Sequence, residues 1–408
     1  MPRSAPASPH YRWVIVATGT LSIFACLGLG RFALGMLLPS MSSGLGLSYA
    51  AQGTVGTANF LGYLAAVLAA GPIAARTGPR PLIVAALALV SGTMLLVSRA
   101  ESLAMLVVLY ALTGFGSGAT NVPMMGLIAR WFDAGTRGRA AGFASIGSGF
   151  AIVASGWLIP AVNRARGADG WRTNWLILAV AVAAIAVVAA LLLRDPPAAP
   201  ALAAGPARPA LPAGRPRAVY VLGLAYAAFG YTYAIYVTFI VTALVRERGF
   251  PEATAGRFWS AVGLLSLLSG PVFGALSDRR GRRFGLTLVF ALQMVAYLLA
   301  AGSGLPRPFL YLSIGLFGVA AWSVPTIMIA AVADHVGPER ALPAFGFITF
   351  FFGVGQVAGP AVAGLLAERT GSFSIAFLMA AALAAAAILV VGMLRAPGAR
   401  VAEPQPGA

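Results

Sequence analysis

Long runs of apolar residues dominate the chain, and short stretches with charge, proline and glycine separate them. A helix needs roughly 20 mostly apolar residues to cross the hydrocarbon core of a bilayer. Twelve runs come close to that length, so the pattern predicts an all-α integral membrane protein with twelve transmembrane helices. The expected spans are residues 12–38, 50–74, 81–98, 103–130, 139–163, 172–193, 218–245, 255–276, 284–302, 307–333, 341–367 and 372–394.

The composition excludes a water-soluble globule. Hydrophobic residues make up 59% of the 408 residues and charged residues only 10%, whereas a soluble domain carries about 25% charged residues. The formal charge of +17 comes from 28 basic residues, all of them arginine, against 11 acids. In a soluble protein this excess would indicate nucleic acid binding, but in a helical membrane protein it reports orientation, so no nucleic acid partner is expected.

Arginine also predicts which way the chain crosses the membrane, because short loops rich in arginine stay on the cytoplasmic side. With the N-terminus inside, 18 arginines fall in cytoplasmic segments and 9 in outer loops, so both termini are expected to be cytoplasmic. The inner set is Arg3, Arg12, Arg76, Arg80, Arg130, Arg137, Arg139, Arg194, Arg208, Arg215, Arg217, Arg279, Arg280, Arg282, Arg283, Arg340, Arg395 and Arg400. The outer set is Arg99, Arg164, Arg166, Arg172, Arg246, Arg248, Arg257, Arg307 and Arg369.

The chain divides into two similar halves. Residues 194–217 are rich in Pro, Ala and Arg, which favours an extended cytoplasmic linker. It would join an N-terminal six-helix bundle, residues 1–193, to a C-terminal one, residues 218–394, followed by a cytoplasmic tail, residues 395–408. Motifs of the first half recur in the second at a shift of about 202 to 203 residues, which is typical of a duplicated six-helix unit.

One of the repeated motifs resembles the signature G-x-L-a-D-r-x-G-r-k-x-x-l of the major facilitator superfamily (MFS) of secondary transporters. The copy between the eighth and ninth spans matches it at Gly274, Leu276, Asp278, Arg279, Gly281, Arg282, Arg283 and Leu286. The copy between the second and third spans keeps Gly71, Arg76, Gly78 and Arg80 but has Ala75 in place of the aspartate. The resemblance implies the MFS fold, with two bundles related by pseudo-twofold symmetry. It also implies a cytoplasmic gate at Gly274, Asp278, Arg279, Gly281, Arg282, Arg76 and Arg80, which should depend mainly on the second copy.

A narrower resemblance rests on Gly30-Arg31-Phe32 through Pro39, the tyrosine-rich start of the seventh span, and Glu247-Arg248-Gly249-Phe250. These segments resemble bacterial, mostly uncharacterised permeases akin to monocarboxylate transporters. In those relatives a basic residue on the first helix is associated with the carboxylate of the substrate. The resemblance therefore implies an inner-membrane permease with Arg31 in the matching place.

Arg31 is also singled out by energetics, since it is the one clear ionisable residue within a span. An arginine at mid-membrane costs about 2.5–3.5 kcal/mol on insertion scales, so such residues are functional candidates. A guanidinium that faces a cavity can grip a carboxylate with two hydrogen bonds. The alternative is a side chain that snorkels to the interface or pairs with helix-terminal carbonyls.

Further candidates for substrate contact come from the helices that line the cavity in this superfamily. They are the polar or aromatic residues Asn59, Asn121, Tyr231, Tyr236, Trp322 and Gln356. Hydrogen bonds between helices, or core packing for Trp322, explain them equally well. The tyrosines at 231, 233 and 236 cannot all point one way, so one or two of them are expected to reach the cavity.

Together these features predict an MFS permease that moves a small organic anion, such as a monocarboxylate, by alternating access. All acids lie near span ends, in loops or in the tail, so coupling would run by proton symport or by exchange of one anion for another. The alternative is an exporter of drugs or other hydrophobic compounds, although Trp157 follows Gly156 where drug exporters carry a glycine-proline motif. We expect a monomer without a cofactor or metal, and no enzyme activity.

Overall fold

The structure is a computed structural model that describes residues 10–195 and 216–394. All the secondary structure in these two ranges is helical. The expected linker and tail lie mostly or wholly outside them. The first range contains α1 Tyr11–Ile23, η1 Phe24–Phe32, α2 Ala33–Leu45, α3 Tyr49–Thr77, α4 Pro79–Val97, α5 Leu103–Trp131, α6 Ala134–Arg166, η2 Gly167–Asp169 and α7 Gly170–Leu192. The second contains α8 Arg217–Thr242, η3 Ala243–Glu247, α9 Glu252–Arg280, α10 Arg282–Ala301, α11 Arg307–Ala320, α12 Ser323–Val336, α13 Pro338–Thr370 and α14 Ser374–Gly392.

These elements make twelve spans, as the hydropathy pattern predicts. In the described ranges, 11 continuous helical stretches are long and apolar enough to cross a membrane. One of them, Gly135–Leu192, has 58 residues, which at 1.5 Å per residue is far longer than the roughly 30 Å hydrocarbon core. It contains α6 and α7 on either side of η2 and therefore counts as two spans.

Two spans are irregular in their interior, at positions that the sequence pattern does not indicate. In the first span, α1 and α2 are joined by nine residues of π-helix, η1, in which the backbone N–H of Ala33 bonds to the carbonyl of Gly28, five residues back. The tenth span is broken between α11 and α12, where Trp322 leaves the helical conformation. Its backbone N–H donates instead to Oγ of Ser269 on α9, at 3.0 Å.

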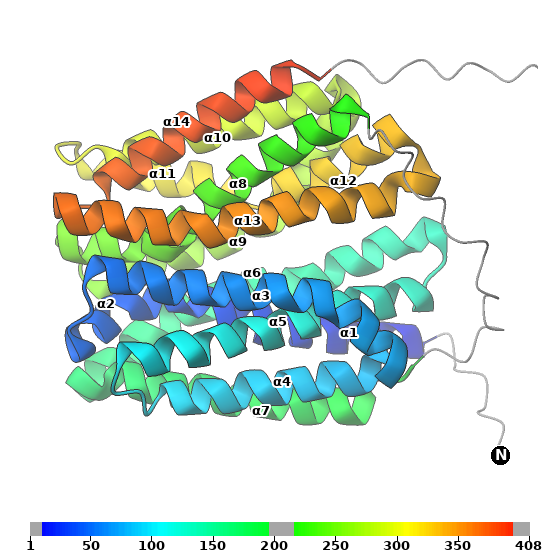
Figure 1. Ribbon diagram of the computed structural model, residues 1–408. Helices are drawn as coiled ribbons and strands as arrows, with labels where there is room; N and C mark the ends of the chain where they lie inside the picture. The colour runs from blue at the N-terminus through cyan, green and yellow to red at the C-terminus, as the bar shows by residue number, and fades with distance from the viewer. Residues whose placement is uncertain (1–9, 196–215, 395–408) are drawn as a thin grey trace, which may run out of the picture.

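The helices form two groups that lie side by side (Figure 1). Helices α1–α7 pack mainly on one another and form the first group, and helices α8–α14 form the second. The groups meet where α3 packs on α13, α6 on α9, and α2 on α8. Helices α1 and α8 begin at one end of the molecule, and α7 and α14 finish there; we call this the terminal end and the opposite one the far end.

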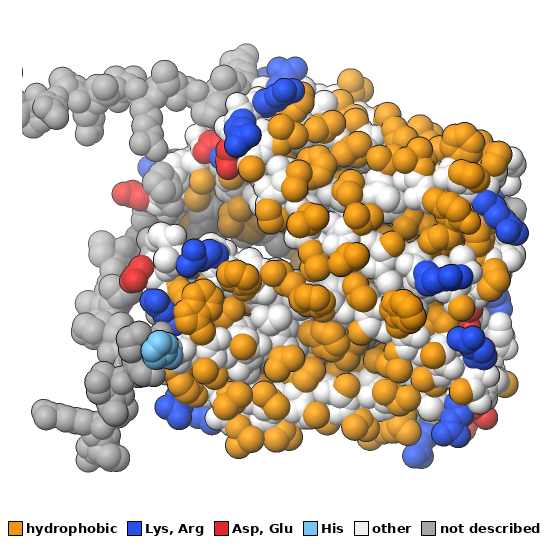
Figure 2. All heavy atoms as spheres, turned by 180° about the vertical axis from the view of Figure 1, so that it is seen from behind, with side chains coloured by type: hydrophobic (Ala, Val, Ile, Leu, Met, Phe, Trp, Pro, Cys, Tyr) orange, Lys and Arg blue, Asp and Glu red, His pale blue; other side chains and the backbone are white. Residues whose placement is uncertain are grey.

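At the far end the two groups are in close contact, and glycines allow it. A Cβ atom on Gly156 of α6 would overlap the carbonyl oxygen of Gly256 on α9, and one on Gly53 of α3 would lie 2.5 Å from the carbonyl oxygen of Pro360 on α13. Toward the terminal end of α6, by contrast, a Cβ atom on Gly138 or Gly142 would meet nothing within 4 Å. The groups thus close the far end, and a hollow enters between them from the terminal end (Figure 2).

Candidate functional site

Arg31 lies at the end of the π-helical segment η1, with only 8% of its surface exposed. π-Helical stretches are rare in proteins, and those that occur are frequently found at functional sites. The guanidinium carbon lies 4.2 Å from the ring centre of Phe60 and 4.6 Å from that of Tyr63, both on α3. Aromatic faces stabilise a desolvated cation. Among the described residues, no acid forms an ion pair with Arg31.

The two nitrogens along one edge of the guanidinium, Nε and Nη2, are buried and have no hydrogen-bond partner among the described residues. Arginine presents its donors in a rigid planar fork, so this edge offers two parallel N–H groups. Buried polar groups are normally hydrogen-bonded, and exceptions call for an explanation. The free edge is suited to two acceptor oxygens of a bound anion.

Hydroxyl groups of α5 hold η1 in place. The hydroxyl of Tyr110 donates to the backbone carbonyl of Arg31 at 3.2 Å, and Oγ of Ser117 donates to that of Cys26 at 2.7 Å. A π-helix weakens the regular hydrogen-bond ladder, so these side chains supply partners for carbonyls of the segment. Also on α5, Nδ2 of Asn121 donates to the hydroxyl of Tyr63 on α3 at 2.8 Å, which positions the ring that covers the guanidinium.

A small cavity adjoins Arg31, with room for about one water molecule. It is lined by Arg31, Phe32, Leu34, Gly35, Gly56, Asn59, Phe60, Tyr110, Val237 and Thr238. Two of these residues, Val237 and Thr238, belong to α8, so the cavity lies between the two helix groups. Asn59 donates through Nδ2 to the carbonyl of Tyr110 at 3.2 Å, while its Oδ1 is buried without a partner.

The tyrosines of α8 are arranged differently from the sequence expectation. The hydroxyl of Tyr231 lies 3.5 Å from Sδ of Met379 on α14, and that of Tyr236 lies 2.9 Å from Oγ of Ser313 on α11. Both therefore point into the second group and away from Arg31. The tyrosine that contacts the first group is Tyr233, whose ring centre lies 6.5 Å from that of Phe32. Tyr231 and Tyr233 are two positions apart and face opposite sides of a helix, so only one can face the first group.

Trp322 and Gln356 differ in their distance from this centre. The indole of Trp322 lies 5.4 Å from the rings of both Phe32 and Tyr233, so these three aromatic residues join the two groups next to Arg31. The indole Nε1 is buried without a partner among the described residues. Gln356, on α13, is 2% exposed and does not line the small cavity.

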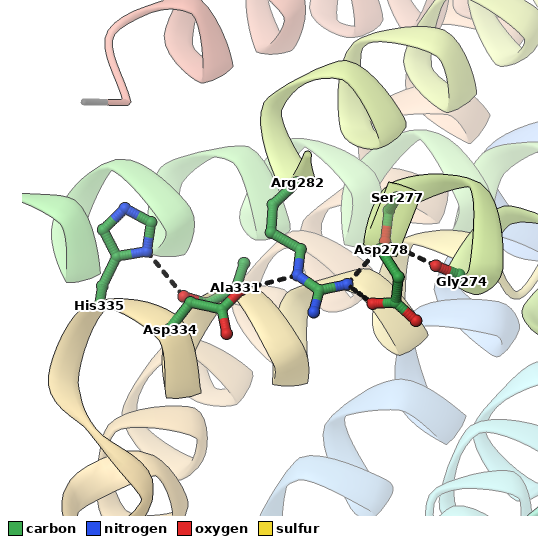
Figure 3. A network of polar contacts seen from close by, with 7 residues as sticks. All are labelled: Gly274, Ser277, Asp278, Arg282, Ala331, Asp334 and His335. Carbon is green, nitrogen blue, oxygen red and sulfur yellow. Dashed lines mark hydrogen bonds and ion pairs between the residues drawn. The ribbon is translucent and has the colours of Figure 1, made fainter. Parts of the chain in front are cut away.

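A second cluster lies at the terminal end, around the signature loop between α9 and α10 (Figure 3). Arg282 donates from Nε to Asp334 of α12 at 2.7 Å, and from Nη1 to Asp278 and to Oγ of Ser277, both on α9. Gly281 has φ of +91°, and its counterpart Gly78 in the first group has φ of +86°. Glycine reaches this conformation without strain, which explains why both copies of the loop keep it.

The remaining gate candidates form fewer side-chain contacts than Arg282 does. Gly274 accepts a hydrogen bond from Ser277 through its carbonyl, whereas Arg279 and Arg76 are exposed and form no ion pair with other described residues. In the first group, Nη2 of Arg80 donates to the carbonyl of Ala190 at 2.7 Å. Its backbone N–H donates to Asp195 at 3.4 Å. A carboxylate from the end of α7 thus lies at the loop that lacks the aspartate of the signature.

We expect Arg282→Gln to lower the free energy of unfolding by about 1–2 kcal/mol, because it removes two partly exposed ion pairs and a hydrogen bond. The matched control is Arg279→Gln in the same loop, which should cost less than about 0.5 kcal/mol. Thermal unfolding of the purified protein in detergent measures both. Equal losses for the two variants would show that the network does not hold α9, α10 and α12 together.

A third polar cluster, missed by the sequence analysis, closes the far end. Asn163 of α6 donates to Glu252 of α9 at 2.5 Å and to Ser40 of α2 at 3.2 Å, and its Oδ1 accepts from Asn174 of α7 at 2.8 Å. Close by, Arg246 of η3 donates to Ser43 of α2 at 2.8 Å. Contacts from Asn163 to Glu252 and from Arg246 to Ser43 cross from one helix group to the other. The open pocket of about 660 Å³ at this end shares no lining residue with the cavity beside Arg31.

Comparison with known proteins places these features in context. Residues 23–392 match the family described as "Uncharacterised MFS-type transporter YbfB". The chain is 24% identical to the hexuronate transporter of Bacillus subtilis (strain 168) over 393 residues, which cover 89% of this chain and 90% of that one. It is 26% identical to human monocarboxylate transporter 11 over 413 residues, covering 96% and 85%.

Two further matches differ in extent. The chain is 34% identical to human solute carrier family 67 member A1, but only over 153 residues, which are 37% of this chain and 36% of that relative. The crystal structure of the nucleoside transporter NupG superposes with a TM-score of 0.74 at 14% identity, covering 94% of this chain and 100% of that one, and so shows the same fold. The family matches point to a transporter rather than an enzyme.

Proposed function

The chain belongs to the MFS-type transporter family described as YbfB, and from this membership we propose that it carries a small organic anion, such as a monocarboxylate, across the membrane by alternating access. As a member of this family it is a multi-pass membrane protein that binds a small-molecule substrate. The anionic nature of that substrate is the proposal.

The observation that carries the proposal is the free edge of Arg31. The edge is buried between the two helix groups, it faces no acid among the described residues, and both of its donors lack a partner. A carboxylate fits this edge with two parallel charge-assisted hydrogen bonds, which are about twice as strong as neutral ones. The names of two relatives, a hexuronate transporter and a monocarboxylate transporter, support the same class of substrate.

The arrangement of the two helix groups supports alternating access to the site from the two sides of the membrane. We assign residues 1–193 and 218–394 to two bundles that rock about the site, joined by the linker 194–217. With both termini in the cytoplasm of an inner membrane, the terminal end faces inward. The far-end contacts at Gly156, Gly256 and Asn163 then close the site to the outside, and the hollow of Figure 2 enters between the groups from the inside.

Coupling is assigned on the same basis. In the part of the chain that the structure describes, no acid forms an ion pair with Arg31 that could carry a proton at this site. We propose that a proton crosses with the anion or that one anion exchanges for another, and that one chain is sufficient. Residues Asn59, Asn121, Trp322 and Gln356 stay candidates for substrate contact, and Tyr233 replaces Tyr231 and Tyr236.

Export of a hydrophobic compound is the second candidate, because Phe32, Tyr233 and Trp322 form an apolar surface beside Arg31. A neutral or cationic drug would leave the guanidinium edge without a partner. Such a substrate would therefore gain no binding energy from Arg31, the residue of this span whose insertion into the membrane costs the most free energy.

Counterflow in proteoliposomes tests the two candidates. We expect vesicles preloaded with small carboxylates to accumulate a labelled carboxylate, and lipophilic cations to give no exchange. If a proton crosses with the anion, a pH gradient should raise net uptake. If one anion exchanges for another, the gradient should leave the exchange rate unchanged. Exchange of lipophilic cations without exchange of any carboxylate would reject the anion transporter in favour of the exporter.

A further inference from the structure

The open pocket at the far end is a second cavity between the two helix groups. Its volume of about 660 Å³ falls within the range of roughly 300–1,000 Å³ that is usual for small-molecule sites. Helices α2 and α6 of the first group line it on one side, and η3 and the start of α9 in the second group line it on the other. Because both groups supply its walls, the pocket is complete only while the far end is closed.

Two arginines, one from each group, line this pocket without a counter-charge. They are Arg164 at the end of α6 and Arg246 in η3, and neither forms an ion pair with another described residue. Nη2 of Arg246 donates to Oγ of Ser43 on α2 at 2.8 Å, which holds this guanidinium at the pocket wall. A guanidinium group has five N–H donors, so most of those of Arg246 stay available to a ligand.

The pocket also contains one acid, Glu252, whose carboxylate is already engaged. It accepts a hydrogen bond from Nδ2 of Asn163 at 2.5 Å. Asn163 is 7% exposed and is fixed in this orientation, because it also donates to Ser40 and accepts from Nδ2 of Asn174. Among the residues that line the pocket, two positive charges against one negative charge leave one positive charge over. A single negative charge on a ligand would balance it.

Closure of the far end brings the two arginines to the same pocket. Arg164 belongs to the first group and Arg246 to the second, so their repulsion opposes closure, although water and salt weaken it at these exposed positions. An anion between them attracts both and removes this cost. The walls also include Pro39, Pro160 and Val245, so a ligand with an apolar body would bury apolar surface as well.

We propose that the far-end pocket binds an organic monoanion with an apolar body from the outer side, and that the bound anion holds the far end closed. The inference concerns a second site and rests on the proposed orientation and alternating access. The acidic group of the ligand lies between Arg164 and Arg246, and its apolar body lies against the proline-rich wall. A ligand that binds one conformation better than another shifts the equilibrium toward it, so the anion acts as an inhibitor of outward opening.

Matched acids and amides test the inference on the purified Arg31→Gln protein in detergent. This variant removes the anion-binding edge of the central cavity, and Arg31 does not line the far-end pocket. Thermal unfolding is followed during titration with benzoate and benzamide, and with hexanoate and hexanamide. Binding to the folded state raises the unfolding temperature, so each titration gives a Kd. We expect at least one of the two acids to bind at least about tenfold more tightly than its amide.

Two further variants in the same background assign the binding to the pocket. Arg164→Gln removes one of the two charges, and we expect it to weaken binding of the preferred acid at least about tenfold, because a charge-assisted hydrogen bond is lost. Arg166→Gln is the matched control. This arginine is exposed at the same helix end but does not line the pocket, so the Kd should stay within about twofold.

Cysteine labelling tests the effect on conformation. Thr238 is 5% exposed beside Arg31, on the opposite side of the far-end contacts from the outer solution. In Arg31→Gln with Thr238→Cys, a saturating concentration of the preferred acid should slow the reaction with a membrane-impermeant maleimide added from outside at least about threefold. Adding Arg164→Gln should remove this effect, and adding Arg166→Gln should keep it. If Arg31→Gln does not fold, the same comparison of Arg164→Gln with Arg166→Gln is made without it.

The outcomes separate this inference from the proposed function. Equal Kd values for acids and amides overturn the outer site, and so does acid binding that Arg164→Gln leaves unchanged. Labelling that is unchanged or faster with the acid bound overturns the inhibition of outward opening. If these results are as expected and counterflow detects no carboxylate exchange, the proposed anion transport fails and the outer site stands.

Discussion

Arg31→Gln should abolish carboxylate transport, with at least about a hundredfold loss in uptake at equal amounts of protein in the membrane. Removing one partner of a buried, hydrogen-bonded charge pair costs about 2–5 kcal/mol in binding. Glutamine keeps a polar group but removes the positive charge and the pair of parallel donors at Nε and Nη2. Arg31→Lys should recover only part of the activity, because an ammonium group is a point charge without the planar edge.

Stability separates this effect from misfolding. Arg31 is buried without an ion pair to the described residues, so its charge opposes folding, and glutamine should raise the unfolding temperature of the purified protein. Arg99→Gln, in an exposed loop, is the control and should change neither uptake nor stability. If Arg31→Gln is present in the membrane at the normal level and takes up the carboxylate at the normal rate, Arg31 does not bind the substrate.

Gly156→Leu should stop transport by holding the far end open. A Cβ atom at this position would overlap the carbonyl of Gly256 and Oγ of Ser260, and a change of rotamer does not move a Cβ atom. The added side chain would hold α6 and α9 apart, so closure of the far end, and with it the conformation seen here, would be strongly disfavoured. We expect at least a tenfold loss of uptake with little loss of protein.

Cysteine labelling reads out the conformation directly. Thr238 is 5% exposed and lines the cavity beside Arg31, so Thr238→Cys should react slowly with a membrane-impermeant maleimide added from outside. The native Cys26 is fully buried. Adding Gly156→Leu should speed the reaction at least about tenfold. Gly92→Leu, where a Cβ atom meets nothing within 4 Å, should leave the labelling rate unchanged.

Much of the fold could be predicted because the membrane imposes it. Apolar runs of a defined length must be helices, and this gave the twelve spans. The helix ends were less certain: the span expected at 139–163 begins at Ala134 and ends at Arg166, since α6 continues past the apolar core. Likewise α2 continues past Pro39 as far as Leu45, followed by Gly46 in the left-handed conformation that ends many helices.

The candidate site was predicted less completely, for physical reasons. A charge inside a span is visible in the sequence, and Arg31 was found in this way. The rings of Phe60 and Tyr63 that cover it look like ordinary apolar positions of a helix. Tyr231 and Tyr236 were named and Tyr233 was not, because periodicity gives the relative faces of a helix but not its rotation within the bundle.

The far-end cluster shows a different limit. Asn163 and Glu252 lie at the ends of α6 and α9, where polar residues are common in any membrane protein. Their contact depends on how two helix groups meet, which no local pattern encodes. The sequence signal that could have found them is a comparison of the span ends in the two halves. An acid at the end of one span and an amide at the corresponding end of a span in the other half are candidates for such a contact.

The π-helical segment η1 makes the site depend on chain length as well as on side-chain identity. Each residue advances an α-helix by about 100°, whereas a π-helix closes its hydrogen bonds over five residues and turns less per residue, so converting Phe24–Phe32 to regular α-helix without removing a residue would turn the guanidinium away from Phe60 and Tyr63. Every side chain of the far half of the span would turn with it relative to the near half. A regular α-helix throughout this span would keep a binding residue at the same phase only if the span were shorter by the residues that the π-helix takes up.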